Sequence, residues 1–179
     1  MQAYISGPLH AAKDLEKARS FYEFLATVCT QAGIEAYVPH MHTDPVRQAA
    51  VSDEDVFRTD YAAMCNAAVI IAAIGEASSG VGAELGVAYQ AGIPVIGLFR
   101  TGERPSRFLL GMLKDMPRAM VFSFAHETEC ASRLQDALRE LSEAGEALLE
   151  GRCTPRSGRR HITRSKSGRV TGTPLGTFE

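Results

Sequence analysis

Five short apolar segments that alternate with stretches of helical spacing constrain the fold of this chain more than any other feature. In residues 14–32, apolar side chains recur every three or four positions, and Gly33 is expected as the C-cap. Strands that alternate with helices favour a parallel sheet with helices on both faces. Right-handed crossovers then predict an α/β fold, a three-layer Rossmann-like or flavodoxin-like sandwich with a five-stranded parallel sheet. The predicted strands are residues 2–6, 34–38, 69–74, 94–99 and 119–124.

Capping signals help to place the helices between these strands. Ser52 and Asp55 resemble a capping box at the start of one helix, and Ser106 is a candidate N-cap for a short one. The expected helices cover residues 14–32, 52–67, 81–91, 106–113 and 127–149, and residues 40–51 are expected to form a loop.

Charge divides the chain into a body and a tail. Residues 151–179 hold seven of the 19 Lys and Arg residues but only one of the 21 acidic residues, so residues 1–150 carry a net charge of −8. An acidic body is a poor binder of nucleic acid, which is therefore not an expected partner. We predict a catalytic domain over residues 1–150 and a basic, flexible C-terminal tail over residues 151–179.

Cysteine spacing and hydropathy bear on the cellular compartment. The four cysteines are far apart and form no Cys-x-x-Cys pair, which favours a reduced intracellular protein without structural zinc. The N-terminus leads directly into the first predicted strand, so no signal peptide is expected. No apolar run approaches the ~20 residues that a membrane helix requires. The prediction is a cytoplasmic protein with no membrane partner.

The most informative stretch is Ala-Ser-Ser-Gly-Val-Gly-Ala-Glu-Leu-Gly, residues 77–86. It lies between a predicted strand and a helix, where open α/β sheets bind ligands. Gly80 and Gly82 allow close backbone approach, and the Ser78 hydroxyl with the first helical amides makes an anion cradle. Glu84 is expected in the first helical turn, where the helix dipole would keep its carboxylate ionised. On its own, this stretch is equally well explained as a Gly-rich structural turn.

Three motifs occur in a fixed order along the chain: Tyr-Ile-Ser-Gly-Pro at residues 4–8, Asp60 in the helix before the third strand, and Ser-x-Gly-Val-Gly-x-Glu-Leu-Gly at residues 78–86. Together they resemble the nucleoside 2-deoxyribosyltransferase superfamily. Within it, the sequence is most similar to the 2'-deoxynucleoside 5'-phosphate N-hydrolase branch. The resemblance covers residues 3–125, roughly, and leaves the tail out.

The resemblance implies a catalytic role for three residues. Glu84 would be the nucleophile that attacks the anomeric carbon and forms a covalent glycosyl-enzyme. Tyr4 would donate a hydrogen bond to Glu84, and Asp60 would act on the leaving base. Without the resemblance, Tyr4 is an ordinary strand aromatic and Asp60 a solvated helix residue.

The same resemblance implies a binding site for the substrate. Ser78 and the amides of Gly80 and Gly82 would hold a 5'-phosphate, and His40 would line the base side. Ser106 matches a serine that reaches the phosphate from a neighbouring subunit, which implies a homodimer or a higher oligomer. Taken alone, Ser106 is better explained as a helix N-cap.

The first-strand motif departs from the N-hydrolase pattern. Ser6, Gly7, Pro8 and His10 occupy candidate substrate-binding positions. The N-hydrolase branch often has a Ser and an Arg where this chain has Pro8 and His10. The pair Gly7-Pro8 is more similar to the transferases.

No metal or cofactor is expected. His40-x-His42 with Asp44 is the only candidate metal cluster, and it lacks a third ligand at suitable spacing.

The preferred hypothesis is an enzyme of nucleotide salvage, an N-glycosidase that hydrolyses the base–sugar bond of (2'-deoxy)nucleoside 5'-monophosphates through a glycosyl-Glu84 intermediate. One alternative is a nucleoside 2-deoxyribosyltransferase that exchanges bases between deoxynucleosides. Another is a non-catalytic nucleotide-binding module, which the presence of Glu84 beside an anion cradle disfavours.

Overall fold

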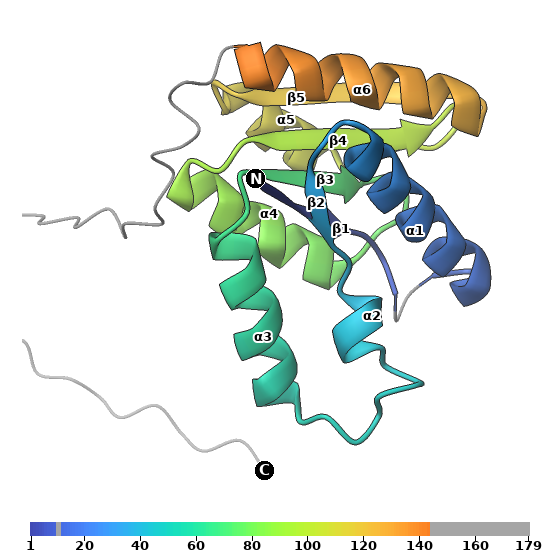
Figure 1. Ribbon diagram of the computed structural model, residues 1–179, viewed down its shortest axis with the longest axis vertical. Coiled ribbons are helices and arrows are strands. Elements are labelled where there is room, and N and C mark those ends of the chain that lie inside the picture. Colours follow the sequence, from blue (N-terminus) through green and yellow to red (C-terminus); the bar gives the residue numbers. More distant parts are fainter. Residues whose placement is uncertain (10–11, 144–179) are drawn as a thin grey trace, which may run out of the picture.

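The computed structural model describes residues 1–9 and 12–143 (Figure 1). Its centre is a five-stranded, fully parallel sheet with the strand order β2-β1-β3-β4-β5. The predicted α/β fold with a five-stranded parallel sheet is confirmed. The strands are β1 (Gln2–Ser6), β2 (Glu35–Tyr37), β3 (Val69–Ala73), β4 (Val95–Arg100) and β5 (Ala119–Phe124).

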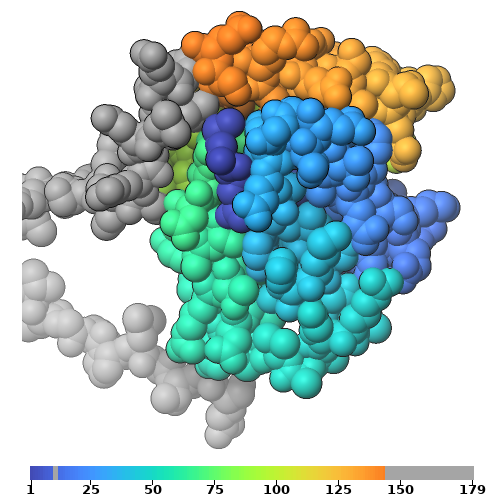
Figure 2. Space-filling view, in the orientation of Figure 1, coloured from blue at the N-terminus to red at the C-terminus, as the bar shows by residue number. Residues whose placement is uncertain are grey.

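Helices cover both faces of the sheet and complete the three layers (Figure 1). α1 and α6 pack on one face, and α3, α4 and α5 pack on the other. On the visible side of the molecule, α1 lies between α6 and the segment that follows β2 (Figure 2). None of the described helices has the length and apolarity needed to cross a membrane. The helices are α1 (Leu15–Gln31), α2 (His40–Thr43), α3 (Asp53–Cys65), α4 (Ser79–Ala91), α5 (Arg107–Asp115) and α6 (Glu127–Glu143).

Serine side chains cap three helices. The hydroxyls of Ser52, Ser78 and Ser106 accept hydrogen bonds from backbone amides in the first turns of α3, α4 and α5. The predicted N-cap roles of Ser52 and Ser106 are therefore confirmed. Each cap satisfies an amide that lacks a partner within its own helix.

The structure differs from the sequence prediction in the segment after β2. Residues 40–51 were expected to form a loop, but they begin with the short helix α2. Pro39 precedes it in a helical backbone conformation, which suits a proline at the start of a helix. Three predictions lie outside the described residues: the end of the last helix at 144–149, the tail at 151–179, and the role of His10.

The alternation of side chains along β1 decides which residues reach the site. Ala3 and Ile5 pack into the apolar cluster that includes α1 and α6. Tyr4 packs into the cluster on the opposite face, with residues of α3, α4 and α5. Ser6 shares that face because residues two apart on a strand point to the same side. β1 therefore presents two hydroxyl groups toward α4.

The strand order places a topological switch point at the carboxyl ends of β1 and β3. The chain leaves β1 toward β2 on one side and leaves β3 toward β4 on the other, and the helices that make these two connections lie on opposite faces. Such a switch point is where open α/β sheets bind ligands. β1 ends there with Ser6, and the loop that leads from β3 to Ser78 begins there.

Gly7 is required by packing against α1. A Cβ atom at Gly7 would lie 2.3 Å from Cζ of Tyr22. The Tyr22 ring is buried, and its hydroxyl donates to the carbonyl of Pro8 at 2.8 Å, so the ring is held in place. The turn after β1 therefore depends on a residue without a side chain.

Replacing Gly7 with Ala is expected to destabilise the fold by about 1–3 kcal/mol, as other overpacked sites do. The matched control is Gly111→Ala in α5, where a Cβ atom meets nothing within 4 Å. It is expected to stabilise the protein by roughly 0.5–1 kcal/mol, because glycine disfavours a helix interior. Thermal unfolding checks both variants, and equal unfolding midpoints would contradict this account of Gly7.

Candidate active site

The carboxylate of Glu84 is held by two hydroxyl groups from β1. Its Oε1 accepts a hydrogen bond from the Tyr4 hydroxyl at 2.7 Å, and its Oε2 accepts one from Ser6 Oγ at 2.6 Å. Both donors are fully buried, whereas Glu84 is only partly buried. The predicted bond between Tyr4 and Glu84 is confirmed. Ser6, predicted to bind substrate, donates its only hydroxyl proton to Glu84.

The electrostatic environment of Glu84 differs from the one expected. Glu84 lies in the second turn of α4, which begins at Ser79, so the prediction of a first-turn position was wrong. Burial raises the pKa of Glu84, the hydrogen bonds from Ser6 and Tyr4 oppose this rise, and the charge of Asp60 adds to it. The net effect is a raised pKa, because burial outweighs the two donors.

Asp60 is a second partly buried carboxylate on the same face of the sheet. Its Oδ1 accepts a hydrogen bond from the Tyr37 hydroxyl at 2.8 Å, and the Thr43 hydroxyl lies 3.0 Å from Oδ2 and 3.2 Å from Oδ1. Burial raises the pKa of Asp60, and the bonds from Tyr37 and Thr43 and the nearby His42 oppose the rise. Asp60 is therefore an embedded acid whose field reaches Glu84, and not the solvated helix residue that was the alternative to a catalytic role.

Three residues at this site were not predicted: Tyr37, His42 and Thr43. The rings of Tyr4 and Tyr37 stack at 5.6 Å between centroids, and those of Tyr37 and His42 stack at 4.5 Å. Tyr37 pairs directly with Tyr4 in the sheet. The aromatic residue at the end of the second predicted strand was therefore a signal from which its place beside Tyr4 could have been predicted. His40 and His42 point to different sides because residues two apart diverge on a helix such as α2, which the loop expected over residues 40–51 did not reveal.

His40 lies away from both carboxylates. It is buried, with Nε2 3.0 Å from Glu23 Oε1 and its ring beside Tyr22. His42 instead stacks on Tyr37, and the Asp44 carboxylate is bound by Arg19. Within the part of the chain that the structure describes, no group of three or more His, Cys, Asp or Glu residues is arranged to hold a metal.

A cavity of about 700 Å³ lies at the N-terminal end of α4 and brings Ser78 and Ser106 together within one chain. Gly82 and Arg104 also line it. The Ser78 hydroxyl caps the helix through the amide of Val81 at 3.3 Å. The Gly82 amide donates to the Ser78 carbonyl at 3.1 Å, so it is engaged in the helix rather than directed at the cavity.

A family model described as nucleoside 2-deoxyribosyltransferase matches residues 3–148. The chain belongs to the nucleoside 2-deoxyribosyltransferase family. The resemblance inferred from its motifs is therefore confirmed. A comparison with curated protein sequences found no match.

Solved structures similar to this member of the family share its fold. The CMP N-glycosidase BcmB from Clostridium botulinum has a TM-score of 0.58 and 21% identity over 75% of this chain and 97% of its own. A conserved protein from Enterococcus faecalis V583 has a TM-score of 0.57 and 19% identity, covering 75% and 97% of the two chains. The 2-deoxyribosyltransferase from Bacillus psychrosaccharolyticus has a TM-score of 0.54 and 20% identity, covering 75% and 96%.

These comparisons bear on the predicted class of protein. The family is one of enzymes, and the similar structures include an N-glycosidase and a deoxyribosyltransferase. The prediction that the chain is an N-glycosyl hydrolase or a nucleoside 2-deoxyribosyltransferase is confirmed at the level of the family.

Glu84→Gln is expected to raise the thermal unfolding midpoint at about pH 7. A raised pKa means that the folded state holds the Glu84 proton more tightly than the unfolded state, whose ordinary value is 4.5. Ionisation at neutral pH therefore costs stability, and glutamine removes that cost. The gain should vanish as the pH falls below 4.5, where the carboxyl group is protonated in both states.

Calorimetry of both proteins across this pH range measures the effect. The matched control is the exposed Glu140→Gln in α6, which is expected to leave the midpoint unchanged. A Glu84→Gln variant that is less stable than the parent at neutral pH would contradict the interpretation.

Proposed function

We propose that this protein is an N-glycosidase that hydrolyses the base–sugar bond of (2'-deoxy)nucleoside 5'-monophosphates. The observation that carries the proposal is the Glu84 carboxylate, which accepts hydrogen bonds from Tyr4 at 2.7 Å and from Ser6 at 2.6 Å. An oriented, partly buried carboxylate suits attack on an anomeric carbon that develops oxocarbenium character.

The reaction proceeds in two steps. First, a Glu84 oxygen bonds to the anomeric carbon as the base–carbon bond breaks, and the electron pair of that bond leaves with the base. Asp60 donates a proton to the departing base, a role that its raised pKa supports. Water then attacks the anomeric carbon, Glu84 leaves as a carboxylate, and a water proton returns to Asp60.

The cavity beside α4 supports a 5'-phosphate on the substrate. Ser78 and Ser106 offer hydroxyl groups, and Arg104 adds a positive charge. Gly80 lies exposed in the first turn of α4, where backbone amides and the helix dipole favour an anion. The similar structure from Clostridium botulinum carries the nucleotide CMP in its name.

We further infer a cytoplasmic homodimer in which Ser106 also contributes to the partner's site. Ser106 opens α5, and its neighbour Phe108 is 82% exposed beside the cavity. An apolar ring left in solvent at this position supports a contact with a second subunit.

Base transfer between deoxynucleosides is the second candidate. Pro8 stands where the hydrolase branch often has a phosphate-binding serine, and proline has neither a hydroxyl nor a backbone N–H to donate to a phosphate. The segment after β1 therefore offers fewer hydrogen-bond donors to a phosphate than the N-hydrolase resemblance implies. The similar structure from Bacillus psychrosaccharolyticus is a 2-deoxyribosyltransferase.

One experiment separates the candidates. Nucleosides and their 5'-monophosphates are incubated with the enzyme, with or without a second free base, and the products are resolved by chromatography. Base released from the monophosphates alone supports the N-hydrolase. Exchanged deoxynucleosides would favour the transferase, and nucleotide binding without base release would favour a non-catalytic module.

Glu84→Ala is expected to reduce base release by at least about 10³-fold, because it removes the nucleophile. Glu140→Gln is the matched control. Glu140 lies exposed on α6, on the opposite face of the sheet, so its loss should leave turnover near that of the parent. Full activity in Glu84→Ala would refute the covalent mechanism.

Ser6→Ala is expected to move the acidic limb of the kcat/KM profile to higher pH. The Ser6 hydrogen bond lowers the pKa of Glu84, so its loss raises that pKa and protonates the nucleophile over a wider range. Tyr4→Phe should shift the limb in the same direction. Ser142→Ala, in α6, is the control, and an unmoved limb in Ser6→Ala would argue against this role.

A further inference from the structure

The surroundings of Asp60 depend on a segment that no strand holds in place. We call residues 39–48, which follow β2, the base-side wall. Within it, the Thr43 hydroxyl lies 3.0 Å and 3.2 Å from the two oxygens of Asp60, and the His42 ring stacks on Tyr37. The position of this wall therefore decides whether Thr43 reaches Asp60, whereas the other hydrogen bond to Asp60 comes from Tyr37 on β2.

Apolar packing does little to anchor the wall. Its two large apolar side chains, Met41 and Val46, are 53% and 65% exposed. Its most buried side chains are polar: His40, Thr43 and Asp44. The wall is therefore fixed mainly by polar contacts.

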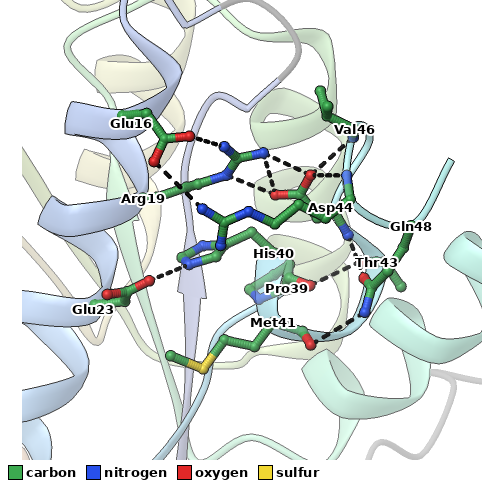
Figure 3. Close-up of polar contacts among 11 residues, drawn as sticks. Glu16, Arg19, Glu23, Pro39, His40, Met41, Thr43, Asp44, Val46 and Gln48 are labelled. Atoms are coloured by element: carbon green, nitrogen blue, oxygen red, sulfur yellow. Dashed lines mark hydrogen bonds and ion pairs between the residues drawn. The ribbon is translucent and has the colours of Figure 1, made fainter.

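The strongest of these contacts is a buried ion pair with α1 (Figure 3). Arg19 is 4% exposed and Asp44 is 1% exposed. Arg19 Nε donates to Asp44 Oδ2 at 2.7 Å, and Nη2 lies 2.7 Å from Oδ1 and 2.6 Å from Oδ2. The remaining guanidinium nitrogen of Arg19 bonds to Glu16, one turn earlier on the same helix. This two-pronged geometry fixes both distance and direction.

Asp44 also organises the backbone of the wall. Its Oδ1 accepts hydrogen bonds from the amides of Val46 at 2.8 Å and Arg47 at 2.7 Å, and its own amide donates to Gln48 Oε1 at 2.7 Å. Burial alone raises the pKa of Asp44, but the Arg47 amide and Arg19 outweigh it and bring the pKa to about 2. Asp44 is therefore ionised at neutral pH, as the ion pair with Arg19 requires.

A buried ion pair is a poor device for stability alone. Removing two charges from water costs several kcal/mol, and apolar residues of similar size are often as stabilising or more so. Its benefit here is geometric, because Asp44 is the residue directly after Thr43. Through Thr43, α1, the helix that connects β1 and β2, is thereby linked to the Asp60 carboxylate on α3.

We propose that Arg19 and Asp44 are positioning residues, which hold the base-side wall on α1 and, through Thr43, orient Asp60 for its step at the leaving base. The proposal rests on the proposed function in assigning that step to Asp60.

The test compares the intact protein with the double variant Arg19→Met/Asp44→Asn. The double variant removes both charges, so no unpaired charge is buried. The asparagine oxygen can still accept hydrogen bonds from the Val46 and Arg47 amides. Circular dichroism and the unfolding midpoint establish that it folds. Arg19→Lys keeps the positive charge but loses the two-pronged hydrogen bonding of the guanidinium. Its kcat should therefore lie between those of the parent and the double variant. Arg139→Met, which breaks the exposed pair with Asp136 at 3.2 Å, is the matched control.

Two readouts are measured. The first is base release, for which kcat should fall about 10- to 100-fold in the double variant, since small misplacements of a catalytic group have effects of this size. KM should change less. If the pair acts through Thr43, its effect on kcat and that of Thr43→Val will be less than additive.

The second readout needs no activity. The ring protons of His42 should show the ring-current shift of the Tyr37 stack in NMR spectra, and the double variant should lose it. His42→Gln assigns the resonances, and Arg139→Met should keep the shift.

A folded double variant with the parent's kcat and His42 shifts would overturn the proposal. Additive effects with Thr43→Val would overturn the route through Thr43. A parent protein that releases no base would instead refute the proposed function and the catalytic part of this inference, while the His42 shifts would still decide whether the ion pair holds the wall.

Discussion

Two hydroxyl groups on one strand hold the carboxylate around which the site is built. Tyr4 and Ser6 point to the same face of β1, and Glu84 reaches them from α4, eighty and seventy-eight residues further along the chain. These bonds join a central strand to the helix that connects β3 and β4. The orientation of Glu84 therefore depends on the register of the sheet, and a site held by regular elements keeps its geometry well.

This arrangement places two acids where water is scarce. Burial raises the pKa of both Glu84 and Asp60, and the hydrogen bonds that each accepts oppose that rise. Proteins tolerate such unfavourable groups at functional sites when the remainder is well packed. Here two apolar clusters, one on each face of the sheet, contain fully buried residues such as Leu25, Ile71 and Leu85. The stability of the core offsets the cost of the site.

The two sides of the site are held by different means. On the Glu84 side, the register of the sheet and the packing of α4 hold the carboxylate in place. On the Asp60 side, the wall of residues 39–48 has few apolar anchors and relies on Arg19, Asp44 and Thr43. A polar network specifies one geometry more sharply than apolar contacts do, because each hydrogen bond has a direction.

Motif order allowed part of the site to be predicted. The role of Glu84 and its bond to Tyr4 were implied by the family resemblance that two distant motifs carry, and the structure brings the two side chains within 2.7 Å. The partners of Asp60 did not follow. Tyr37 ends β2, and Thr43 lies in α2, in the same connection as α3. No local pattern in the sequence pairs them with Asp60, which follows them by 23 and 17 residues. The raised pKa of Glu84 was also missed, because burial by distant residues outweighs the hydrogen bonds from Ser6 and Tyr4.

The sequence by itself determined the elements and their order. Short apolar runs, helical periodicity and the serine caps are local signals, and alternating strands and helices leave few topologies open. Only the tertiary structure decided which of two histidines faces the site, that Ser6 serves Glu84, and that Arg19 lies buried against Asp44. Those outcomes depend on contacts between residues distant in the chain, whose burial and partners exist only once the sheet and its helices have packed.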